Sequence, residues 1–300
     1  MPTPDLSRRA FLTVGGGALL LAACGGSASN AKKPGSGGSS GSDAKAGLSA
    51  FRMEIEPYVS TTPQRFAYIL MKNNGDFASG PTTTLSIAPP GGEFGAPMPA
   101  TLHTEGLPTG RGVYVVEPTL MAAGDWRGKV AIEGHGEAEL AFPVSANPDT
   151  PIVGSPARIL ASPTTAAPLG TDPLCTRTDD KNNAAPCAFH QTSLDQVVGK
   201  GKPVVVMFAT PARCQSRYCG PVLDQLIEVS PEYQDRITPI HVEIYKDLTS
   251  NNLVTATETW LGFSGEPWIF GINAAGTVTG RLSGAFATDE IKTLMDQAIA

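Results

Sequence analysis

A buried-strand pattern runs directly into a pair of cysteines and then into a helical pattern, within residues 204–229. Residues 204–208 read Val-Val-Val-Met-Phe, which is apolar on both faces, as in a central parallel strand. Cys214 and Cys219 follow, and residues 221–229 carry apolar side chains at helical spacing. A helix N-terminus has partial positive charge, which favours a thiolate over a thiol. This run predicts an α/β domain with a redox-active cysteine pair at the start of a helix.

The spacing of the pair leaves two geometries open. Four residues, 215–218, separate Cys214 from Cys219. In a continuous α-helix, residues five apart have Cα atoms about 8.7 Å apart, whereas a disulfide needs less than about 7 Å. Either Cys214 precedes the helix and the bridge forms in place, or oxidation must unwind the first helical turn.

The elements around the pair have a recognisable order. From residue 192 the patterns predict helix, strand, helix, strand, helix, strand, strand and helix. The corresponding ranges are 193–198, 204–208, 221–229, 237–244, 252–261, 267–272, 277–282 and 288–299.

Residues 190–300 resemble the thioredoxin-like superfamily, and more specifically extracytoplasmic TlpA-like bacterial lipoproteins. The resemblance rests on the strand-to-cysteine junction, Pro221 two residues after Cys219, and the Glu266-Pro267 pair before a strand and hairpin. It implies that Pro267 is a cis-proline facing the active-site sulfurs. We expect Cys214 to be the nucleophile and Cys219 the resolving cysteine.

Two arginines close in sequence could tune this chemistry. Arg213 directly precedes Cys214, and Arg217 is three residues after it. A nearby cation lowers the pKa of a thiol.

The resemblance implies a membrane-anchored extracytoplasmic thiol–disulfide oxidoreductase that acts on thiols and disulfides of exported proteins. The alternative is a non-catalytic binding or structural lipoprotein in which Cys214–Cys219 is a structural disulfide. A lesser alternative is a peroxiredoxin-like peroxidase. That family resembles Pro-X-X-X-Thr-X-X-Cys at its reactive cysteine, but Met207 and Pro211 occupy the proline and threonine positions here.

The N-terminal 23 residues predict an export signal. Arg8 and Arg9 lie in a twin-arginine pattern, and the uncharged run that follows is too short to span a bilayer. Leu21-Ala22-Ala23-Cys24 resembles a bacterial lipobox, which implies a lipid on Cys24 and attachment to the outer face of the cell membrane. Residues 24–47 are rich in glycine and serine and predict a flexible tether.

Residues 48–145 predict an all-β, immunoglobulin-like sandwich. Short apolar runs alternate with breakers such as Asn73-Asn74-Gly75-Asp76, and helical periodicity is absent. The segment 112–126 resembles the final hairpin of small extracytoplasmic immunoglobulin-like modules, with Trp126 expected in the core.

Residues 146–189 are rich in proline, alanine and threonine and predict a linker. With Cys24 set aside, four cysteines remain, so we predict a structural Cys175–Cys187 disulfide. His190 and His241 each lie among apolar residues and are expected to be ordinary buried histidines. We therefore expect no metal site and no cofactor.

The charge of the chain argues against nucleic acid as a partner. The net charge is −6, and removal of Asp5, Arg8 and Arg9 with the signal changes it to −7. A protein that binds phosphate backbones needs a basic surface instead.

Overall fold

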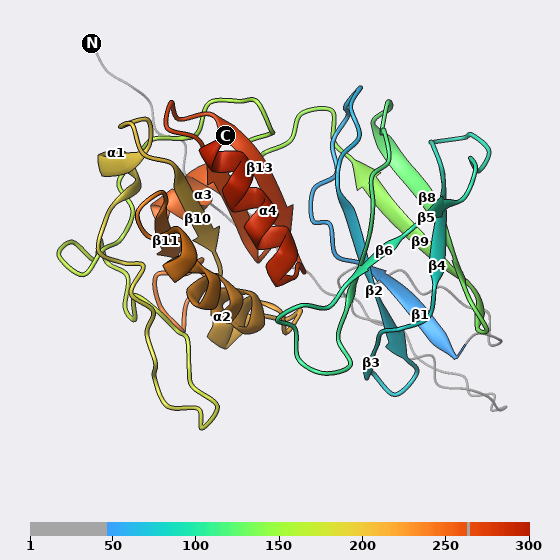
Figure 1. Ribbon diagram of the computed structural model, residues 1–300, viewed down its shortest axis with the longest axis horizontal. Helices are drawn as coiled ribbons and strands as arrows, with labels where there is room; N and C mark the ends of the chain where they lie inside the picture. Colours follow the sequence, from blue (N-terminus) through green and yellow to red (C-terminus); the bar gives the residue numbers. More distant parts are fainter. Residues whose placement is uncertain (1–46, 263–264) are drawn as a thin grey trace, which may run out of the picture. The chain divides into compact units, whose positions relative to one another are not determined.

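The computed structural model describes residues 47–262 and 265–300 (Figure 1). The predicted export signal with Arg8 and Arg9, the lipidation residue Cys24 and nearly all of the tether lie outside these residues. Within the described part of the chain, no helix has the length and apolar character needed to cross a membrane.

The C-terminal region is a mixed α/β domain that resembles a thioredoxin fold. Its sheet has the strand order β11-β10-β12-β13, in which β11 is parallel and β12 antiparallel to β10. The strands are β10 (Val204–Phe208), β11 (Thr238–Val242), β12 (Trp268–Ile272) and β13 (Val278–Ser283). The helices are α1 (Leu194–Val197), α2 (Cys219–Val229), α3 (Thr255–Leu261) and α4 (Thr288–Ile299), with short 3-10 turns at Pro211–Arg213 and Ser230–Tyr233. This order confirms the α/β prediction.

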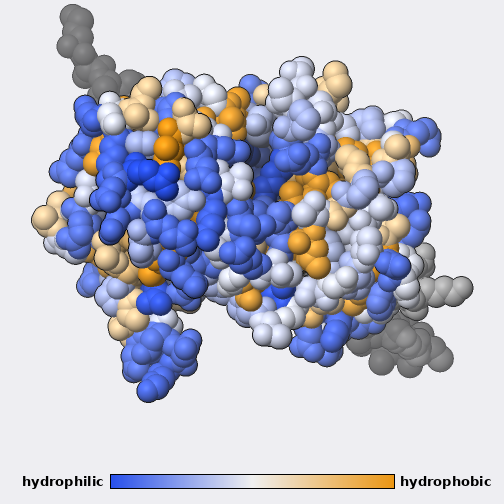
Figure 2. Space-filling model, viewed as in Figure 1, coloured by the Kyte–Doolittle hydropathy of each residue, from blue (hydrophilic) through white to orange (hydrophobic). Residues whose placement is uncertain are grey.

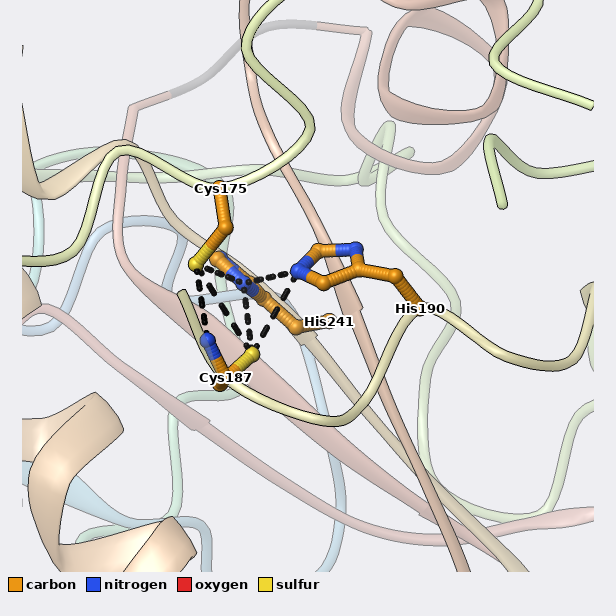
Figure 3. A group of neighbouring side chains, drawn as sticks. All are labelled: Cys175, Cys187, His190 and His241. Carbon is orange, nitrogen blue, oxygen red and sulfur yellow. Dashed lines mark hydrogen bonds between the residues drawn. The ribbon is translucent and has the colours of Figure 1, made fainter. Parts of the chain in front are cut away.

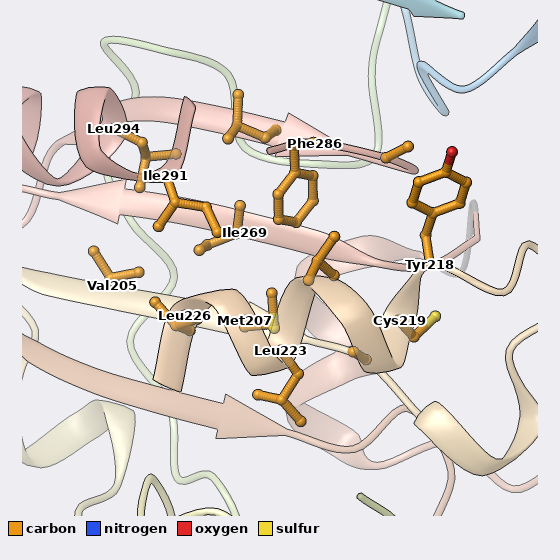
Figure 4. Packing of buried hydrophobic residues seen from close by; sticks show 14 of the residues in the cluster. Val205, Met207, Tyr218, Cys219, Leu223, Leu226, Ile269, Phe286, Ile291 and Leu294 are labelled. Atoms are coloured by element: carbon orange, nitrogen blue, oxygen red, sulfur yellow. The ribbon is translucent and has the colours of Figure 1, made fainter. Parts of the chain in front are cut away.

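Both faces of this sheet are buried, as the apolar run in β10 predicted. Val205 and Met207 of β10 belong to one apolar cluster, with residues of α2 and α4 (Figure 4). Val204, Val206 and Phe208 belong to a second cluster, with residues of α1 and α3. Alternate residues of a strand point to opposite faces, so a strand covered by helices on both sides needs continuous apolar sequence.

The N-terminal region is a sandwich of two antiparallel sheets. In the described residues, one sheet has the order β1-β2-β7-β6 with β3 beside β2, and the other has the order β5-β4-β8-β9. The first contains β1 (Leu48–Arg52), β2 (Phe66–Lys72), β3 (Phe77–Ala78), β6 (Thr101–His103) and β7 (Val113–Val116). The second contains β4 (Thr83–Ala88), β5 (Met98–Pro99), β8 (Gly124–Ile132) and β9 (Gly136–Val144). Trp126 is buried in the core, as predicted.

Two expectations need correction. The predicted hairpin over residues 112–126 does not form, because β7 pairs with β2 and β6 whereas β8 pairs with β4 and β9. The chain crosses from one sheet to the other between these strands. The segment 146–189 is also more than a spacer: Ala157 packs in one core cluster of the α/β domain and Cys175 in the other.

Large apolar side chains are mostly covered. The face in Figure 2 is largely hydrophilic, with separate apolar patches. Those large apolar side chains that are exposed come from different segments of the chain: Phe51, Val59, Met121, Val153, Ile159, Leu169 and Leu248.

Candidate functional site: a cysteine pair at a helix N-terminus

The cysteine pair occupies the loop that joins β10 to α2. After β10 ends at Phe208, a 3-10 turn covers Pro211–Arg213, and Cys214 follows it in extended conformation. Helix α2 then begins at Cys219. Arg217 has a φ of 64°, which lets the chain reverse between the two cysteines.

Cys214 and Cys219 form a disulfide, with Cα atoms 5.9 Å apart. This separation is shorter than five residues of continuous helix allow. The bridge forms in place because Cys214 precedes the helix and only Cys219 belongs to it. Of the two geometries that the spacing left open, the structure has the one that needs no unwinding of the helix.

The two cysteines differ in exposure. Cys219 is fully buried against the sheet (Figure 4), whereas Cys214 is only partly buried. Cys214 lines a pocket of about 300 Å³ together with Thr176, Arg217 and Pro221. An incoming sulfur can therefore approach Cys214 more easily than Cys219.

Polar groups around the Cys214 sulfur favour negative charge on it. The backbone N–H of Cys219, the first residue of α2, donates to Cys214 Sγ at 3.2 Å. The Ser216 hydroxyl lies 3.3 Å from the same sulfur. Hydrogen-bond donors and a helix N-terminus both stabilise a thiolate over a thiol.

The guanidinium groups of the two arginines contact other partners. Arg213 binds the Ser250 carbonyl and Asn251 Oδ1, and its guanidinium lies 3.9 Å from the centre of the Tyr245 ring. The guanidinium of Arg217 lies 4.6 Å from the centre of the Phe77 ring. A role for either arginine in tuning Cys214 stays a prediction.

Pro267 lies at the end of the sheet that leads to the cysteine loop. The Glu266-Pro267 peptide bond is cis, as the resemblance implied. Because Trp268 pairs with Phe208, Pro267 lies beside the residue that follows β10. Glu266 accepts a hydrogen bond from the backbone N–H of Thr210 in the same loop. Burial raises the pKa of Glu266 to about 7, against the opposing effect of that hydrogen bond.

The predicted Cys175–Cys187 disulfide is absent. Both cysteines are free, and their sulfurs lie 3.8 Å apart. The side chains of His190 and His241 lie against them, so the nearest neighbours of the two sulfurs include imidazole nitrogens (Figure 3). Hydrogen bonds from Cys187 and from both histidines lower the pKa of the Cys175 thiol, although burial opposes the shift.

His190 and His241 were expected to be ordinary buried histidines, so the expectation of no metal site missed this group of four. One local signal was present, since Cys187 and His190 are three apart in a loop, a spacing that suits two ligands of one ion. His241 lies on β11, 51 residues after His190 in the chain. Only the folded chain brings its side chain next to the other three, so sequence spacing could not predict this ligand.

Comparison with known proteins gives distant structural similarities. The chain matches no protein-family model, and no curated protein sequence matches it. Half of the chain is similar to all of a chain described as a thiol:disulfide interchange protein DsbE from Chlorobium tepidum, at 14% identity and a TM-score of 0.35. A further 34% is similar to 96% of the Lin-41 filamin domain, at 10% identity and a TM-score of 0.24.

Proposed function

We propose that this protein is a thiol–disulfide oxidoreductase whose redox centre is Cys214–Cys219. The observation that carries the proposal is the asymmetry of the pair. A partly exposed cysteine faces a pocket and accepts a hydrogen bond from a helix N-terminus, while its partner is buried directly behind it. Attack and resolution need two such different environments.

In the reducing direction, the Cys214 thiolate attacks one sulfur of a substrate disulfide. A mixed disulfide forms, and the other substrate sulfur leaves as a thiolate. Cys219, as a thiolate, then attacks Cys214 Sγ, which releases the second substrate thiolate and forms the Cys214–Cys219 bridge. Two electrons pass from the protein to the substrate, and the oxidising direction is the reverse of these steps.

Pro267 would shape the substrate groove. It lies beside the chain that leaves β10, and it has no backbone N–H to compete for a partner there.

We propose exported proteins as the substrates and the outer face of the cell membrane as the location. Support comes from the sequence alone: the twin-arginine pattern at Arg8 and Arg9 and the lipobox-like residues before Cys24. An oxidising compartment is also where structural disulfides form, and these would need reduction or reshuffling.

The competing function is a binding protein in which Cys214–Cys219 only staples a loop. Two contacts that hold the loop in place favour this structural role of the disulfide. Arg111 donates a hydrogen bond to the Arg217 carbonyl at 2.6 Å, and Tyr218 packs edge-on against Phe77.

A trapping experiment separates the two functions. In the Cys219→Ser variant, Cys214 can attack a substrate but nothing resolves the product, so mixed disulfides should accumulate and disappear on reduction. The Cys214→Ser/Cys219→Ser variant is the matched control and should trap nothing. Equal recovery of disulfide-linked partners from both variants would exclude Cys214 as the nucleophile.

A further inference from the structure

Four side chains with metal-binding atoms meet in the α/β domain, in a group that we call the Cys–His cluster: Cys175, Cys187, His190 and His241 (Figure 3). Their ligand atoms all lie within 4.8 Å of one another. Cys175, His190 and His241 are buried, and Cys187 is half-buried. Three of them come from the irregular segment before α1, and His241 comes from the middle of β11.

Five of the six separations between these atoms match the edges of a metal tetrahedron. Zinc–sulfur and zinc–nitrogen bonds of about 2.3 and 2.05 Å give edges of about 3.8 Å between sulfurs, 3.6 Å between sulfur and nitrogen, and 3.3 Å between nitrogens. The two sulfurs are 3.8 Å apart, and His241 Nδ1 lies 3.7 and 3.5 Å from Cys175 and Cys187. Cys187 Sγ lies 3.3 Å from His190 Nε2, and the two histidine nitrogens are 3.2 Å apart.

The second nitrogen of His241 supports the same assignment. His241 Nε2 lies 3.0 Å from the Ala209 carbonyl oxygen, which can only accept a hydrogen bond. The Nε2 atom must therefore carry a proton. When the ring is neutral, its lone pair is on Nδ1, the atom that lies against the sulfurs. A ligating histidine held by a backbone carbonyl through its other nitrogen is the usual outer-shell arrangement at metal sites.

We propose that the Cys–His cluster binds one zinc ion in a tetrahedral Cys₂His₂ site. Two thiolates and two imidazoles fill the four positions that zinc prefers and leave none open for a substrate. The ion would be structural rather than catalytic.

The site would fasten the segment before α1 to the sheet, next to the cysteine loop. Ala209, whose carbonyl oxygen holds His241, follows β10 directly and precedes that loop. Thr176, the neighbour of Cys175, accepts a hydrogen bond from the Ala212 backbone N–H at 3.2 Å. Two residues at the proposed site, His241 and Thr176, therefore hydrogen-bond to the chain that leads into the Cys214 loop. Zinc binding at this site does not depend on the redox function of that loop.

Elemental analysis of the purified full-length protein tests the proposal. After expression with zinc supplied and purification without chelators, we expect one zinc per chain. Cys175→Ser, Cys187→Ser and His190→Gln should each lower the zinc content by about 10-fold or more. Two matched controls should keep it: His135→Gln, which changes an exposed histidine, and Cys214→Ser/Cys219→Ser, which removes the other pair.

A second measurement does not depend on the folding of variants. Cobalt added to metal-stripped, reduced wild-type protein should give the absorption of a tetrahedral thiolate site, and zinc should then abolish it. Zinc should also protect Cys175 and Cys187 from alkylation until a chelator is added. Wild-type protein that takes up neither ion, that contains copper in place of zinc, or that keeps a Cys175–Cys187 disulfide after zinc reconstitution under reducing conditions would overturn the proposal.

Discussion

At the scale of single residues, the two sulfurs of the redox pair have opposite surroundings. Cys214 Sγ accepts a hydrogen bond from the backbone N–H of Cys219 and faces a pocket, whereas the Cys219 side chain is fully buried. The sequence predicted the pair at a helix start with Cys214 as the nucleophile, but it could not give the difference in exposure between the two sulfurs. That difference depends on where the helix begins relative to Cys214.

The asymmetry predicts unequal reactivity. In the reduced protein, iodoacetamide should modify Cys214 at least about 10-fold faster than Cys219, because Cys214 is both more accessible and richer in thiolate. Brief alkylation followed by peptide mass spectrometry measures the two rates. Faster modification of Cys219 would mean that the roles of the two cysteines are reversed.

Glu266 predicts a specific pH dependence of stability. Its pKa is raised by burial to about 7 in the folded protein, from an ordinary value of 4.5. The folded state therefore binds more protons than the unfolded state between these pH values, so the contribution of Glu266 to stability falls as pH rises through this window. The total loss is about 3 kcal/mol once the pH is above 7.

The Glu266→Gln variant isolates this effect, since an amide oxygen can still accept the Thr210 N–H. Relative to wild type, its free energy of unfolding should rise between pH 4.5 and 8 by about 3 kcal/mol. Urea titrations at both pH values provide the measurement. A difference between the two proteins that does not change with pH would show that Glu266 keeps an ordinary pKa.

At the scale of elements, the strongest sequence patterns were the most reliable. The ranges predicted for β10 and for the terminal helix over 288–299 agree with the structure, because the first is a continuous apolar run and the second has apolar residues at helical spacing. Strands β3 and β5 have only two residues each, too few to show any alternation. The hairpin over residues 112–126 was wrong because sheet membership depends on long-range pairing.

The apolar face of helix α2 should contribute most of the free energy that holds the helix against the sheet. Leu226 is buried with residues of the sheet and α4 (Figure 4). Asp224 is exposed and paired with Arg177 at 2.6 Å. Leu226→Ala should lower the free energy of unfolding by about 2–5 kcal/mol. Asp224→Ala, two residues earlier on the same helix, should lower it by less than about 1 kcal/mol. Similar losses in both variants, measured by urea unfolding, would contradict this packing.

At the scale of the whole molecule, a buried charge network joins the sandwich to the α/β domain. Arg65, directly before β2, binds Glu54 at 3.1 Å, Glu290 of α4 at 2.7 Å and the Ala285 carbonyl at 2.6 Å. All three charged side chains are largely shielded from water. No short motif predicts such a network, because Arg65 lies 225 residues before Glu290 and 220 residues before Ala285.

Arg65→Met should leave two buried carboxylates without their cation and lower the free energy of unfolding by about 3–5 kcal/mol. Lys129→Met is the matched control, since it removes the exposed pair with Glu137 and should cost less than about 1 kcal/mol. Urea midpoints compare the two variants. An equally small loss for Arg65→Met would mean that the network does not hold the two domains together.

The proposed oxidoreductase function requires Cys214–Cys219 to be a redox centre. The reduction potential of this cysteine pair tests the requirement most directly. The purified protein would be equilibrated in glutathione buffers of known potential, and the fraction of bridged Cys214–Cys219 followed by differential alkylation and mass spectrometry. We predict a potential between about −120 and −270 mV, the range of catalytic dithiols. A value below about −300 mV would mark the bridge as structural and contradict the proposed function.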